Sequence, residues 1–117
     1  MSFNHYARKV RNPDLSIWTR LAALRSCILS LSVLTTERFH EALERFDARF
    51  EFERYRSESP NYRWHKSEQP SEENLLAALN AIEIERNQLL ENLRIIAQQR
   101  KLEKLRKKSQ SANHQKN

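Results

Sequence analysis

Apolar residues recur at helical spacing in the first third of the chain. They follow one another at intervals of four, three, four and three, which places them on one face of a helix. This stripe consists of Ile17, Leu21, Leu24, Ile28 and Leu31. Pro13 with Asp14 or Ser16 is a typical helix start. Further apolar residues widen the stripe, as in helices at the centre of a bundle. The pattern predicts a helix over residues 14–34.

A second stripe follows a short break at Thr35 and Thr36, where the Thr36 hydroxyl can cap the next helix. The stripe repeats the four-three-four spacing and consists of Phe39, Leu43, Phe46 and Phe50. Glu41 and Arg45 have the spacing of a favourable i,i+4 ion pair. These features predict a helix over residues 36–55 that packs antiparallel on the first as a hairpin. Residues 50–66 also alternate between apolar and polar, so a small β-hairpin is the alternative there.

A third helix is predicted after a linker of about residues 57–71, which is rich in proline and serine. Ser71 is a candidate N-cap, and Glu72 and Glu73 suit the first turn of a helix. Its stripe consists of Leu75, Leu79, Ile82, Leu89, Leu93 and Ile96. Arg86 and Arg100 fall on the same seam, so the apolar pattern is shorter than in an extended coiled coil. We expect a helix over residues 71–105 that stays packed to about Arg100.

These elements predict an all-α fold, an antiparallel helical hairpin closed by a longer third helix into a three-helix bundle. We expect a basic N-terminal arm over 1–13, one helical domain over 14–100 and a basic, partly disordered tail over 101–117. The third helix has more apolar residues than one face of a bundle requires. Its stripe, from Leu75 to Ile96, is therefore the expected interface with a second copy or another protein.

The chain contains no glycine. A Rossmann turn, a Walker-type phosphate loop, a nucleophile elbow and an EF-hand all require glycine, because their backbones take positive φ or approach a ligand closely. These sites are therefore excluded. For the same reason we expect no helix to end on a residue in the left-handed conformation.

The net charge of +6 is concentrated at the C-terminal end, where residues 100–117 hold seven Lys and Arg against one Glu. A basic helix end can serve as a solvated, solubilising tail, as a contact for nucleic-acid phosphates, or as a contact for an acidic protein or anionic surface. Like charges at i,i+4, such as Arg100 with Lys104, favour a partner over a bare tail.

Two further basic segments are candidate phosphate contacts. One is the N-terminal arm, and the other is the linker, where an aromatic ring beside cations could stack on an unpaired base or pack inward. The candidate nucleic-acid-binding residues are Arg8, Lys9, Arg11, Arg63, Trp64, Lys66, Arg100, Lys101, Lys104, Arg106, Lys107 and Lys108. A helix-turn-helix reader is disfavoured, because the second predicted helix has a negative net charge.

Catalytic and metal chemistry find little support in the sequence. The four histidines, at 5, 40, 65 and 114, form no i,i+3 or i,i+4 pair, so no metal site is predicted. Cys27, the single cysteine, lies among leucines and is expected to be buried. We predict no cofactor and no enzymatic activity.

The expected location is the cytoplasm. A lone cysteine suits a reducing compartment, and Arg20 and Arg25 interrupt the longest apolar stretch, which argues against a membrane span. A transit peptide is the alternative for the basic first 36 residues, although a regular core stripe occupies the same positions.

The sequence therefore predicts a small helical protein that contacts the phosphate backbone of DNA or RNA through its basic C-terminal end and N-terminal arm. The alternative is an adaptor or structural subunit of a protein complex, in which the stripes dock on partner helices and the basic end meets an acidic protein. A homo-oligomer or a larger complex is expected in either case.

Overall fold

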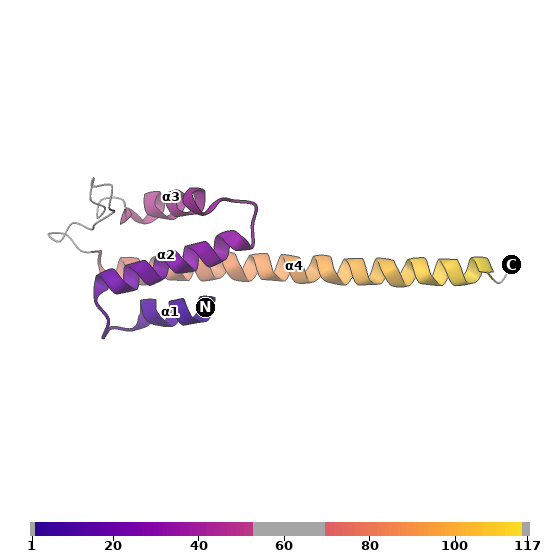
Figure 1. The fold of residues 1–117 in the computed structure, drawn as a ribbon, viewed down its shortest axis with the longest axis horizontal. Coiled ribbons are helices and arrows are strands. Elements are labelled where there is room, and N and C mark those ends of the chain that lie inside the picture. The colour runs from indigo at the N-terminus through magenta and orange to yellow at the C-terminus, as the bar shows by residue number, and fades with distance from the viewer. Residues whose placement is uncertain (1, 53–69, 116–117) are drawn as a thin grey trace. The chain divides into compact units, whose positions relative to one another are not determined.

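The computed structural model describes residues 2–52 and 70–115, and their side chains as far as Gln110. Four helices are present in these ranges: α1 (Phe3–Arg11), α2 (Ile17–Val33), α3 (Phe39–Phe50) and α4 (Glu72–Gln115). The all-α prediction is confirmed for the described residues, with one helix more than expected. Figure 1 shows α2 lying between α1 and α3.

Helix α1 replaces the expected N-terminal arm. Phe3, Ala7 and Val10, spaced four and three, are buried, while Arg8 and Lys9 are exposed. The Ser2 hydroxyl caps the helix by accepting a hydrogen bond from the His5 backbone N–H at 3.4 Å. The short amphipathic pattern therefore folds onto the core rather than extending into solvent.

Hydroxyl caps fix the starts of α2 and α4. Ser16 Oγ accepts a hydrogen bond from Thr19 N–H at 3.2 Å, and Ser71 Oγ accepts one from Asn74 N–H at 3.1 Å. Each bond satisfies a backbone donor that has no partner within its own helix. The prediction of Ser71 as a cap is confirmed, and of the two candidates near Pro13 it is Ser16 that caps α2.

Helix α3 is shorter than predicted at both ends. It begins at Phe39 with Arg38 as its N-cap, so the predicted cap at Thr36 is wrong. In the connection, the Thr35 hydroxyl donates to Ser32 O at 3.2 Å and accepts from Glu37 N–H at 3.1 Å. It ends because Glu51 adopts the left-handed conformation, with φ 59° and ψ 31°. The expectation that no helix ends on such a cap is therefore wrong. The alternative of a β-hairpin over residues 50–66 falls largely on residues 53–66, which lie outside the described residues.

The hydrophobic core lies where α1, α2 and α3 meet the first turns of α4. The large side chains with less than 2% exposure are Val10, Leu21, Leu24, Cys27, Ile28, Leu31, Phe46, Phe52, Leu75, Leu79 and Ile82. They come from all four helices and from Phe52 just after α3. The expected burial of Cys27 is confirmed.

Polar contacts join α4 to α3. Asn74 Nδ2 donates to Phe50 O of α3 at 2.7 Å. Arg45 of α3 binds Glu85 through two hydrogen bonds of 2.8 and 3.0 Å, and it also binds Glu37. The expected pairing of Arg45 with Glu41 is replaced by these contacts; the Glu41 carboxylate instead accepts from the Arg38 N–H at 3.5 Å.

Arg20 is a buried cation between helices. Its side chain is 5% exposed, and its Nε donates to Val10 O at the end of α1 at 2.7 Å. Its Nη2 donates to Glu72 Oε1 in the first turn of α4 at 2.9 Å. One side chain of α2 thus holds the end of α1 and the beginning of α4 together.

The chain divides into two compact units, Met1–Arg86 and Asn87–Asn117. The last buried side chain of α4 is Ile82, and residues 91–110 are all exposed, whereas the stripe predicts packing to about Arg100. The covering helices are short: 17 residues of α2 span about 26 Å, enough for only four to five turns of a neighbouring helix. No helix in the described ranges is long and apolar enough to cross a membrane.

Candidate nucleic-acid interface

The division into units coincides with a division of charge. Residues 1–86 contain thirteen Lys and Arg and thirteen Asp and Glu, so they have no net charge at pH 7. Residues 87–117 contain eight basic and two acidic residues and hold the whole net charge of +6. The C-terminal unit is thus the electrostatically distinct part of the molecule.

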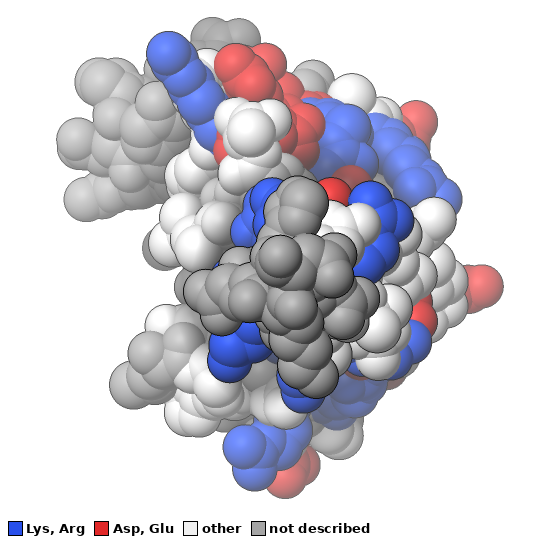
Figure 2. Space-filling model, turned by 90° about the vertical axis from the view of Figure 1, so that its right-hand side faces the viewer, with Lys and Arg blue, Asp and Glu red and all other residues white. Residues whose placement is uncertain are grey.

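The basic residues expected in a tail lie in helix α4, which runs to Gln115. Arg100, Lys104 and Lys107 repeat at four and three, so at 3.6 residues per turn they share one face. Lys101 and Lys108 lie at the edge of that face, and we call these five residues the cationic face. All five are exposed. Figure 2, which views the C-terminal end, shows lysine and arginine side chains gathered around it.

The cationic face is not neutralised within the described residues, where none of its five members forms an ion pair. Arg106 is exposed as well but lies on the opposite side of the helix, and Glu103 flanks the cationic face. Among the described residues of this unit, Glu91 and Arg94 form an ion pair three residues apart, with Arg94 Nε donating to Glu91 Oε2 at 3.0 Å. This contact lowers the pKa of Glu91 and raises that of Arg94.

The α4 stripe expected to bind a partner divides between the two units. Leu75, Leu79 and Ile82 are fully buried, because the chain's own helices cover them. Leu93 and Ile96 are 47% and 43% exposed. Leu89 is partly exposed. The first three side chains are therefore unavailable to a partner in this structure, and the last three remain accessible.

The three basic candidates in α1 have different environments. Arg11 forms an ion pair with Glu83 of α4, which occupies its guanidinium. Arg8 Nε donates to the Asn4 backbone carbonyl at 3.4 Å. Lys9 lines a surface hollow between α1 and α2. The remaining candidates, Arg63, Trp64 and Lys66, lie outside the described residues.

Groups suited to nucleophilic or metal chemistry are few in the described ranges. Burial raises the pKa of the Cys27 thiol to about 12, which keeps it protonated and unreactive at neutral pH. No set of three His, Cys, Asp or Glu side chains among the described residues is placed to hold a metal ion.

Comparison with protein-family models, with curated proteins and with solved structures gives no match. Function must therefore be inferred from the chain's own residues.

Proposed function

We propose that this protein binds nucleic acid without sequence specificity, through the phosphate backbone, with the cationic face of α4. The observation that supports this proposal is the alignment on one side of a helix of five exposed cations, none of which forms an ion pair with another described residue, in a unit of charge +6. Such cations replace counterions condensed on the phosphates, and the released counterions supply the binding free energy. A smaller contribution comes from α1.

The expected salt dependence follows from the number of cations. If each of the five neutralises one phosphate of a duplex, log K falls with log salt with a slope of about −4.5. On a single strand the slope is about −3.5. The test is fluorescence anisotropy of labelled single- and double-stranded oligonucleotides over a salt series that starts at ~50 mM, where counterion release strongly favours binding.

Two variants with equal charge change separate the cationic face from net charge. The double variant Lys104→Gln with Lys107→Gln lowers the charge by two on the face, and Arg106→Glu lowers it by two on the opposite side. We expect the first to reduce the duplex slope by about 1.8 and the second to have a smaller effect. Equal effects would refute a defined face. Absence of binding by the unaltered chain at ~50 mM salt would refute the proposal as a whole.

A second candidate function is a subunit of a helical assembly, with another copy or an acidic protein as partner. The exposure of Leu90, Leu93 and Ile96 favours it, because apolar residues at helical spacing are the usual contacts between helices. Light scattering at micromolar concentration tests self-association, and Leu93→Glu is expected to abolish it. A monomeric unaltered chain would contradict the homo-oligomeric form of this candidate.

A further inference from the structure

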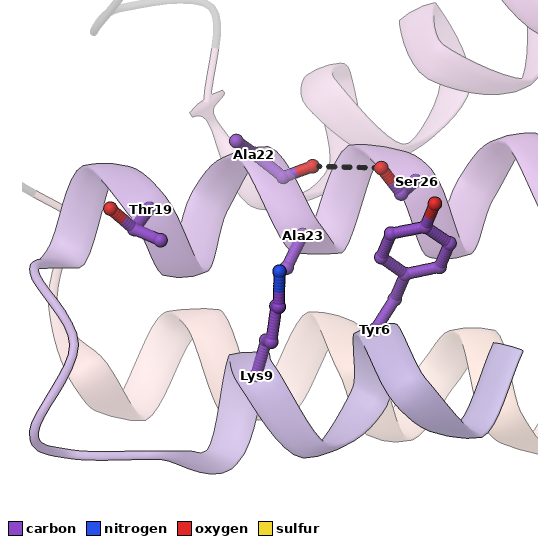
Figure 3. A pocket seen from close by; sticks show the side chains of 6 residues that line it. All are labelled: Tyr6, Lys9, Thr19, Ala22, Ala23 and Ser26. Carbon is purple, nitrogen blue, oxygen red and sulfur yellow. Dashed lines mark hydrogen bonds between the residues drawn. The ribbon is translucent and has the colours of Figure 1, made fainter. Parts of the chain in front are cut away.

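A hollow of about 180 Å³ opens on the surface between α1 and α2. Its described lining consists of Tyr6, Lys9, Thr19, Ala22, Ala23 and Ser26. Figure 3 shows the side chains of Lys9 and Tyr6 extending from α1 toward α2. The two alanines have the smallest side chains that still leave a helix intact, so a ligand can approach α2 closely.

The polar groups of the hollow are suited to an anion. Lys9 provides a cation, and the Tyr6 phenol provides an O–H donor. Thr19 Oγ1 lies 2.8 Å from Ser16 Oγ at the start of α2 and is occupied by that contact. Ser26 already donates to Ala22 O at 3.3 Å. None of the described lining residues is acidic, so nothing among them opposes an anionic ligand.

Lys9 is also distinguished from its basic neighbours in α1. Arg11 is held by Glu83, and Arg8 Nε bonds to the carbonyl of Asn4 in its own helix. Lys9 forms no ion pair within the described residues. Of the three basic residues of α1, it is therefore the one whose charge faces a cavity with a further donor.

We propose that this hollow is a phosphate site, in which Lys9 and the hydroxyl of Tyr6 bind one phosphate group of a nucleic-acid backbone. The proposal rests on the proposed function, because the phosphate group belongs to a nucleic acid that the protein binds. It assigns the contribution of α1 to one residue, whereas the sequence offered three equivalent cations.

The matched variants are Lys9→Gln and Arg8→Gln, which remove one charge each from adjacent exposed positions of the same helix. We expect Lys9→Gln to reduce the salt slope by about 0.9 on a duplex or 0.7 on a single strand, and Arg8→Gln to leave it unchanged. Tyr6→Phe keeps the ring and removes one donor. It is expected to weaken binding about two- to ten-fold at fixed salt without a change of slope.

The outcomes separate this proposal from the proposed function. If Lys9→Gln and Arg8→Gln act equally, or if neither acts, while Lys104→Gln with Lys107→Gln still weakens binding, the phosphate site is refuted and the function of α4 stands. If the unaltered chain binds no oligonucleotide, both are refuted. If inorganic phosphate at millimolar concentration shifts the α1 amide resonances of the unaltered protein but an oligonucleotide does not, the site takes free phosphate and the proposed backbone contact is wrong.

Discussion

The left-handed conformation of Glu51 allows a stability prediction whose sign depends on backbone geometry. At φ 59° and ψ 31° the Cβ of any L-residue other than glycine lies close to the following carbonyl, at a cost of about 1–2 kcal/mol. Glycine lacks that atom, although it loses more chain entropy on folding than alanine. We therefore expect Glu51→Gly to be more stable than Glu51→Ala by roughly 1 kcal/mol. Both variants remove the same carboxylate, so any contact that it makes cancels in the comparison.

The control is the same pair of substitutions at Glu44, an exposed position in the middle of α3. There the order is expected to reverse, with Ala more stable than Gly by about 1 kcal/mol, because the backbone is helical. Urea unfolding, followed by circular dichroism and by tryptophan fluorescence, measures both differences. For a unit of this size 1 kcal/mol corresponds to about 4–8 °C in Tm. If Ala is the more stable residue at both positions, Glu51 is helical and the described end of α3 is wrong.

Three further predictions concern buried or capping groups. Arg20→Ala is expected to lower the free energy of unfolding by about 3 kcal/mol, because it leaves the Val10 carbonyl without its buried donor. Glu72→Gln should lower it by less than about 1 kcal/mol, since the Glu72 side chain is half exposed. Equal losses for the two variants in urea titrations would contradict this asymmetry. Ser71→Ala should lower the free energy of unfolding by about 1 kcal/mol, because it removes the side-chain cap of α4, and Ser71→Thr, which keeps a hydroxyl, is the control. An unchanged urea midpoint for Ser71→Ala would show that the cap does not stabilise the fold. The pKa of Cys27 is raised from 9.0 to about 12 in the folded protein, so the protonated thiol contributes its full stability below pH 9 and loses it between pH 9 and 12. The free energy of unfolding of Cys27→Ala should therefore fall less steeply than that of the unaltered chain over this range. Equal slopes for the two proteins would contradict the raised pKa.

Local signals in the sequence predicted local structure well. The apolar stripe from Ile17 to Leu31 extends over nearly the whole length of α2. Ser71, directly before two glutamates, correctly predicted the start of α4. Helix α1 was missed because its buried face consists of only Phe3, Ala7 and Val10 among basic residues. A three-residue stripe is too short to distinguish a packed helix from a frayed terminus.

Contacts between distant residues were beyond the sequence. Spacing at i,i+4 suggested Glu41 for Arg45, but the tertiary fold brings Glu85, forty residues away, within 2.8 Å. The end of burial after Ile82 was not fixed by the sequence either, because the apolar stripe is interrupted at Arg86 but resumes at Leu89 and Leu93. Burial along α4 depends on the length of the helices that cover it, and the longest of these in the described residues, α2, has only 17 residues.

The cationic face itself could be predicted in composition but not in arrangement. All five residues were candidates, together with Arg106, and the sequence alone left the segment as a partly disordered tail. Helical geometry places Arg106 on the side of α4 opposite the cationic face. Side-chain contacts distinguish Lys9 from Arg8, which bonds to the Asn4 carbonyl, and from Arg11, which pairs with Glu83. The separation provides control variants of equal charge.

The absence of net charge in residues 1–86 has a consequence for association between copies of the chain. A protein at its isoelectric point has no long-range repulsion between copies, and association and precipitation are then favoured. Residues 1–86 are in that condition at neutral pH, and the charge of residues 87–117 supplies the long-range repulsion between copies. Neutralisation of the cationic face by a bound polyanion would remove this repulsion. Under the proposed function, binding of a polyanion would therefore favour association between copies of the chain.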